Sequence, residues 1–212
     1  MSIGLLSVQI AEYSINHSSN LSSSSRRLPL SRALFEFWTI LRQRFDDTLS
    51  FKRDWMDFKN GFSDEREPNG NFWIGLEKMH QLTTNERYRL RFLNFAIDGQ
   101  WRQADYDNIT IDSEKNRYQW HFGEYSGDAG DALRYNDDKW NLPDMPLSTC
   151  DHTATSFCTG KYKCGWWFNN CMQASLTCGY NRSKSYQWLA PWLPPESEDG
   201  HLKASIMMIQ KD

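Results

Sequence analysis

The sequence predicts an α+β fold whose C-terminal third is dominated by loops. Three observations support this prediction. Two segments before residue 83 have helical character, strand-like alternation follows between residues 88 and 122, and all five cysteines lie within residues 150–178. At 212 residues the chain is long enough for one domain with a full hydrophobic core, with or without a tail.

The composition limits the partners of the chain. Aromatic residues make up 15%, including ten tryptophans, while the mean hydropathy is −0.73, so we expect a few large rings to do much of the packing. A net charge of −3 and a pI of about 6.0 provide no basic field for a phosphate backbone, which argues against nucleic acid. No apolar run reaches the roughly 18 residues that indicate a membrane span, so none is predicted.

Residues 1–33 are predicted to be a flexible, serine-rich segment outside the folded domain. Ser18–Ser25 is almost entirely serine and asparagine, a composition typical of linkers. Gly4–Ala11 is too short, and too uncharged at its start, for a convincing signal peptide. The domain is expected over residues 34–212, beginning with a strand-like run at Phe35–Leu41.

Two helical segments are predicted next. In residues 50–62, Phe51, Trp55 and Phe58 fall on one helical face, and Gly61 is a stop signal. Residues 71–82 are expected to form a short buried segment that leads into a second helix.

Strands follow where apolar and polar residues alternate: Tyr88–Leu93, Trp101–Tyr106 and Tyr118–Phe122. Residues 123–146 are rich in Gly, Asp, Asn and Pro, so we expect irregular structure there. The run Leu202–Ile209 is predicted to be a closing strand.

The segment between Cys158 and Cys171 is the most informative for function. It reads CTGKYKCGWWFNNC, and a bond between its end cysteines would close a loop of about 14 residues, worth roughly 3 kcal/mol in the chain-entropy account. Clustered cysteines fit an oxidising compartment. There is no C-x-x-C pair, and the spacing of His152 after Cys150 is unlike that of a zinc finger, so disulfides are favoured over zinc. The odd number leaves at least one thiol free or bonded to another chain.

Several blocks of residues occur in an order and spacing that resemble a known family. They are FKRDW at 51–55 with GF at 61–62, NFWIGLEKMH at 71–80, YSGDAGDAL at 125–133, LSTCD at 147–151 and WW at 166–167. Together they resemble the fibrinogen C-terminal (fibrinogen-like) domain shared by ficolins, tachylectins, tenascins, angiopoietins and fibrinogen.

The resemblance implies a central twisted antiparallel sheet and a loop-rich, disulfide-stapled C-terminal subdomain that carries calcium and ligand. Family members usually begin with a disulfide-linked strand pair. The residues before Phe35 contain no cysteine and match nothing in the family. The first subdomain is therefore expected to be truncated and replaced, or else its first exon is wrongly joined. Loss of this subdomain would leave the first strands with an unprotected edge.

The calcium site implied by the resemblance is altered. The family binds calcium through two aspartates spaced D-x-D, whereas only Asp151 is present here, with Thr153 and Thr155 where acids are expected. Calcium takes six to eight oxygen ligands, so the site is expected to be weak or lost. The competing interpretation is that Asp151 caps or braces its loop.

The resemblance also implies a small ligand pocket beside the second cysteine of the loop. The matching ligand-binding candidates are Tyr162, Asn170, Cys171, Met172, Tyr186 and Trp188. The family has a cis peptide before this cysteine, so the Asn170–Cys171 bond is expected to be cis. Met172 replaces a family histidine and removes a hydrogen-bond donor. The segment between Cys171 and Trp188 is several residues shorter than in the family, which removes part of the pocket wall.

Trp166 and Trp167 are interpreted as buried scaffold rather than as a platform for ligand. Cys164 and Cys178 replace family glycines, which suggests a second bridge, Cys164–Cys178; two independent free thiols are the alternative. Cys150 would then be available for a bond to a second molecule.

The sequence thus indicates a secreted recognition module that binds glycans or cell-surface and matrix ligands through its C-terminal loops. The alternative is a domain that acts by protein contact without a small-ligand pocket. No G-x-S-x-G, HExxH, P-loop or G-x-G-x-x-G occurs, so an enzyme is not expected. Asn-x-Ser/Thr glycosylation sequons begin at Asn16, Asn20, Asn108 and Asn181, and they matter if the chain is secreted.

Overall fold

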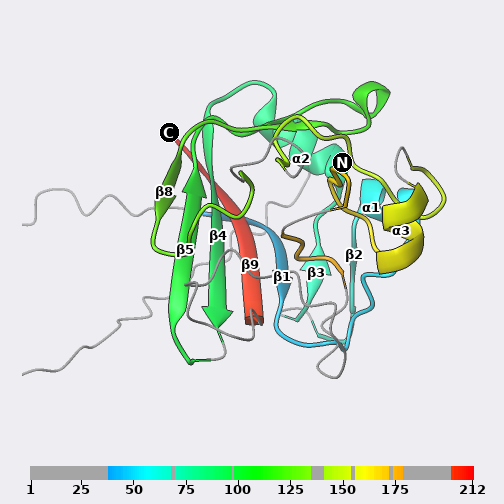
Figure 1. Cartoon of the computed structure of the whole chain (residues 1–212), viewed down its shortest axis with the longest axis horizontal. Helices are drawn as coiled ribbons and strands as arrows, with labels where there is room; N and C mark the ends of the chain where they lie inside the picture. The colour runs from blue at the N-terminus through cyan, green and yellow to red at the C-terminus, as the bar shows by residue number, and fades with distance from the viewer. Residues whose placement is uncertain are drawn as a thin grey trace, which may run out of the picture.

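An antiparallel sheet of seven strands organises the computed structural model, which describes residues 38–67, 70–96, 98–134, 141–153, 156–171, 174–178 and 202–212 (Figure 1). From edge to edge its strands are β2 (Phe62–Ser63), β3 (Phe72–Trp73), β1 (Thr39–Arg44), β9 (Leu202–Lys211), β4 (Tyr88–Ala96), β5 (Trp101–Tyr106) and β8 (Tyr125–Gly127). A second sheet pairs β6 (Thr110–Ile111) with β7 (Trp120–His121). The described helices are α1 (Trp55–Asn60), α2 (Leu76–Thr83), α3 (Ser156–Tyr162) and the short 3-10 helix η1 (Glu114–Asn116). The α+β prediction is therefore confirmed.

The strand latest in the sequence, β9, lies in the interior of the sheet, between β1 and β4 (Figure 1). Its partner β1 also pairs with β3 on the other side. The predicted unprotected edge of the first strand is therefore wrong, because β3 and β9 cover both sides of β1. The outermost strands are β2 and β8, which are only two and three residues long. Such short edges offer little template for pairing with another chain.

The helix α1 is shorter than the sequence predicts because a capping residue fixes its start. The carboxylate of Asp54 accepts a hydrogen bond from the Asp57 N–H at 3.0 Å. Phe51 is buried as expected but lies before the helix, while Trp55 and Phe58 are on its buried face. Gly61 ends the helix at φ 97°, where a side chain would collide with a backbone carbonyl of the strand segment opposite.

The other predicted elements are found with different bounds. Helix α2 and strand β5 lie where expected, and β4 extends three residues beyond Leu93 because its alternation of buried positions continues to Ala96. The run predicted at residues 118–122 contains only β7, since Tyr118 turns the chain at φ 49°. The first strand is described from Thr39, so the start predicted at Phe35 lies outside the described residues.

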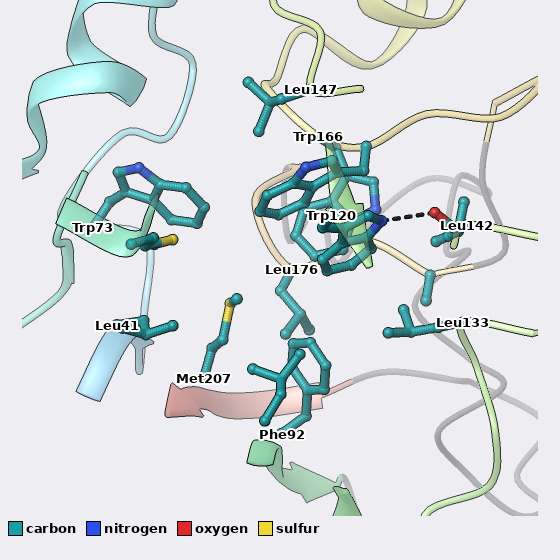
Figure 2. Close-up of a cluster of buried hydrophobic side chains, with 14 of the residues drawn as sticks. Leu41, Trp73, Phe92, Trp120, Leu133, Leu142, Leu147, Trp166, Leu176 and Met207 are labelled. Carbon is teal, nitrogen blue, oxygen red and sulfur yellow. Dashed lines mark hydrogen bonds between the residues drawn. The ribbon is translucent and has the colours of Figure 1, made fainter. Parts of the chain in front are cut away.

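The hydrophobic core joins the sheet to the C-terminal loops through stacked rings. Trp120 and Trp167 lie parallel with centroids 4.1 Å apart, and Trp166 meets both edge to face. Figure 2 shows Phe92 of β4 and Met207 of β9 on the sheet side of this cluster. The expectation that a few large rings do much of the packing is confirmed. None of the helices within the described ranges is long and apolar enough to cross a membrane.

Candidate functional site

Two disulfides hold the C-terminal loop region. Cys158 of α3 is bonded to Cys171, with Cα atoms 5.1 Å apart, and Cys164 is bonded to Cys178, with Cα atoms 5.0 Å apart. Both predicted bridges are confirmed, and all four bonded cysteines are buried. Cys150 is exposed and free, and its thiol donates to the Thr159 carbonyl at 3.2 Å. A bond from Cys150 to a second molecule stays a prediction.

Two buried tryptophans anchor the loop between Cys158 and Cys171 to the core. Trp166 and Trp167 are fully buried, which confirms their interpretation as scaffold. The backbone of Trp166 exchanges two hydrogen bonds with Ser148, at 3.0 and 3.1 Å. The indole N–H of Trp167 donates to the Tyr118 carbonyl at 2.8 Å. The loop is thus tied to the central part of the molecule by both apolar packing and hydrogen bonds.

Helix α3 presents an aromatic and basic surface. Phe157 is 72% exposed, the largest exposure among the described large hydrophobic residues. The ammonium of Lys161 lies 5.9 Å from the centre of the Phe157 ring and 5.2 Å from that of Tyr162. Tyr162 is half-buried and stacks on Phe168 with centroids 6.3 Å apart. Sequence reasoning missed this helix and the exposed ring of Phe157.

The predicted ligand residues are brought together in part. Tyr162 follows Cys158 by four positions on α3, so it shares a face with the disulfide that holds Cys171. Asn170, which is exposed, directly precedes that cysteine. Met172, Tyr186 and Trp188 lie outside the described residues.

The expected cis peptide at Asn170–Cys171 is wrong. No peptide bond between described residues is cis, and both of these residues instead have positive φ, 47° and 83°. The Asn169 N–H donates to the Cys171 carbonyl at 2.9 Å, which closes the turn. Two residues with positive φ therefore reverse the chain here, with every peptide bond of the turn trans.

Asp151 is engaged in structural hydrogen bonds. Its two carboxylate oxygens accept the Trp55 N–H at 3.0 and 3.2 Å, and the Thr149 hydroxyl donates to it at 2.7 Å. Burial opposes ionisation of this carboxyl, but these hydrogen bonds outweigh it and lower the pKa of Asp151. Within the described ranges no group of three or more His, Cys, Asp or Glu side chains is arranged to hold a metal ion. A role of Asp151 as a calcium ligand stays a prediction.

Two buried arginines of β1 hold the segment that contains the second disulfide. Arg42 donates to the Ser205 hydroxyl at 2.6 Å and to the Leu176 carbonyl. Arg44 donates to the Cys178 carbonyl at 2.8 Å and pairs with Asp47 at 2.6 Å. Sequence reasoning missed both. The only signal in the sequence is their i, i+2 spacing on a strand, which places two charges on one face.

Known proteins are similar to this chain in sequence over most of its length. A profile of the family described as fibrinogen beta and gamma chains, C-terminal globular domain, matches residues 34–211. Fibrinogen-like protein 1 of Bos taurus is 37% identical over 153 residues, which cover 68% of this chain and 49% of the relative. The chain spans half or less of the length of the curated relatives it matches.

Solved structures show the same fold. The fibrinogen-like globe domain of human ANGPTL6 superimposes with a TM-score of 0.69 at 27% identity, covering 82% of this chain and 77% of that one. Lamprey fibrin D-dimer, complexed with the peptide ligand Gly-His-Arg-Pro-amide, gives a TM-score of 0.69 at 26% identity, covering 82% of this chain and 61% of that one.

Proposed function

Because the protein belongs to the family of the C-terminal globular domain of the fibrinogen beta and gamma chains, we propose that it is a secreted, non-enzymatic recognition module. It binds a cell-surface or matrix protein through α3 and the loop that the Cys158–Cys171 disulfide closes. One observation carries this proposal: the 72% exposed ring of Phe157, beside Lys161, stands on a helix that is covalently fixed to a buried core.

The physical argument concerns preorganisation. Binding energy in protein interfaces is concentrated in a few aromatic and basic anchors. A rigid anchor loses less conformational entropy when it binds, so more of its contact energy appears as affinity. The bridge from Cys158 to Cys171 and the ring stack between Tyr162 and Phe168 both restrain α3 before any partner arrives. The peptide ligand of the lamprey fibrin structure supports a role for this fold in binding polypeptide.

Glycan binding is a second candidate, favoured by the exposed amide of Asn170 and the tyrosine ring of Tyr162 beside the Cys158–Cys171 bridge. Together with Met172, Tyr186 and Trp188 these residues would form the ligand site. Calcium at Asp151 is proposed to be weak or lost, since its carboxylate already accepts hydrogen bonds from Trp55 and Thr149.

The test is binding of the purified full-length protein to an array of extracellular proteins and to a glycan array, each with calcium and with chelator. The variant Phe157→Ser combined with Lys161→Glu removes the proposed anchors. Phe45→Ser is the matched control, because Phe45 is also an exposed phenylalanine, at 43%, but follows β1. We expect a protein ligand whose affinity falls about thirtyfold in the double variant, the loss of about 2 kcal/mol typical of a hot spot, and is unchanged in the control.

Two outcomes would contradict this proposal. Equal affinities in the double variant and the control would remove α3 from the interface. Binding confined to acetylated sugars, in either the calcium or the chelator arm, would establish the glycan candidate instead. A proposed intermolecular disulfide through Cys150 is read separately on non-reducing gels, where Cys150→Ser should abolish any dimer band.

A further inference from the structure

A glycosylation sequon spans the turn between β5 and β6 and the first residue of β6. It reads Asn108-Ile109-Thr110, and among the four sequons of the sequence it is the one that lies in the described residues. Asn108 is exposed and has a φ of 50°. Asparagine tolerates this left-handed conformation better than most residues, so the turn and the sequon make compatible demands on the position.

The turn is anchored through its middle residue. Ile109 is fully buried, and its backbone N–H donates to the Tyr88 carbonyl at 3.0 Å. The residues on either side, Asn108 and Thr110, are both exposed. The two side chains that a glycosylating enzyme must read therefore face solvent, while the residue between them holds the backbone in place.

The side chains of Asn108 and Thr110 form no hydrogen bond within the described part of the domain. Thr110 also lines a hollow of about 330 Å³, together with His80, Thr84 and Asn116. A sugar attached at Nδ2 of Asn108 would therefore break no hydrogen bond of either side chain, and Nδ2 lies beside Gly123, where an added Cβ would stand 3.4 Å away.

We propose that Asn108 carries an N-linked glycan. The Nδ2 atom would form a bond to the anomeric carbon of the first N-acetylglucosamine as that carbon's bond to a lipid diphosphate donor breaks. The diphosphate leaves with the bonding electrons, and the amide loses one proton. This inference rests on the proposed secretion, because the donor and its transferase meet the protein only in the secretory pathway.

The test uses the full-length protein, expressed in animal cells behind an added cleavable secretion signal. Trypsin releases residues 103–115, a peptide whose single asparagine is Asn108. Amidase removal of the glycan in heavy-oxygen water leaves an isotopic label on a formerly glycosylated position, which mass spectrometry detects. We expect the label in most secreted molecules, its loss in Asn108→Gln and Thr110→Ala, and its retention in Thr110→Ser.

An unlabelled, unmodified 103–115 peptide from secreted, folded wild-type protein would overturn the inference, whether or not the variants fold. The proposed secretion is tested separately, by assaying for the protein outside cells that express it from its natural gene. Its absence there would count against secretion alone, since the signal-bearing protein still reports on Asn108.

Discussion

Asp151 shows how one carboxylate can join two distant parts of a sequence. It lies next to Cys150 in the C-terminal region, yet it accepts the backbone N–H of Trp55, which begins α1. The ring of His152 lies 4.1 Å from that of the same tryptophan and adds an aromatic contact to the junction. The carboxylate therefore satisfies an N–H group that the first turn of a helix leaves without an internal partner.

We predict that Asp151→Ala lowers the free energy of unfolding by about 1 kcal/mol, as loss of a helix cap does. Asp151→Asn keeps an acceptor oxygen and should retain most of that stability. Urea denaturation of the three proteins measures the differences. If bracing is the main role of Asp151, adding a chelator leaves the wild-type midpoint unchanged; a large chelator effect that disappears in Asp151→Asn would instead identify a calcium ligand.

At the scale of elements, the second disulfide and the arginines of β1 act on the same short segment. Cys178 is bonded to Cys164, and its carbonyl accepts from Arg44. The hydroxyl of Thr177 donates to the Gly165 carbonyl at 2.6 Å, beside the bridge. Residues 174–178 are thereby fixed both to the loop that contains Trp166 and Trp167 and to strand β1 of the sheet.

We predict that the double variant Cys164→Ala, Cys178→Ala loses about 3 kcal/mol of stability, because the bridge closes a loop with a sequence separation of 14 residues. Guanidinium denaturation without reductant measures the loss. Cys150→Ala is the control, because it removes a free thiol and should change stability by well under about 1 kcal/mol. A double variant as stable as wild type would mean that the arginine contacts alone hold the segment.

Elements with a long periodic pattern could be predicted, and those made by tertiary contact could not. Strand β5 and helix α2 follow directly from alternation and helical spacing. Helix α3 contains a glycine, a serine and a threonine within its short length, all of them poorer helix formers than alanine, so its sequence favours a helix only weakly. The two-residue strands β2 and β6 exist only because a partner strand lies beside them.

The same division applies to the candidate site. Clustering of cysteines and resemblance to a family pointed to Cys158–Cys171, and the bridge is present. The left-handed turn at Asn170 is a geometric solution that no residue type there demands. Arg42 and Arg44 each donate to a backbone carbonyl 134 residues away in sequence. Because every residue has a backbone carbonyl, no sequence motif could reveal these two partners.

For the whole molecule, carboxylates that join elements indicate how stability depends on pH. The hydroxyl of Tyr118 donates to Glu77 at 2.8 Å, and this bond is the main cause of a lowered pKa of Glu77. Lys59 pairs with Glu114 at 2.6 Å and, with the Trp55 indole, lowers the pKa of Glu114. These contacts tie α2 and α1 to the segment around η1.

Each lowered pKa favours the folded state while the carboxylate is ionised. Its contribution is complete above the unfolded-state pKa of about 4.3 and is lost as the pH falls through the lower folded-state value. We predict a constant urea midpoint between about pH 6 and 8 and a decline below about pH 4.5. Glu77→Gln combined with Glu114→Gln should reduce stability at neutral pH and flatten that decline.

Glu65→Gln, in the turn after β2, is the control for removing a glutamate from the surface. It should leave the pH profile unchanged in shape. A double variant whose stability falls as steeply in acid as that of wild type would place the responsible carboxylates elsewhere.

The interior position of β9 has a consequence for biosynthesis. A ribosome makes β9 after every other described element, so β1 and β4 emerge without the strand that separates them in the finished sheet. The buried guanidinium of Arg42 gains its hydrogen bond to the Ser205 hydroxyl, 163 residues downstream, only when β9 is in place. The nascent polypeptide therefore completes this sheet only after β9 has left the ribosome, and until then the edges of β1 and β4 that β9 covers are open to pairing with other chains.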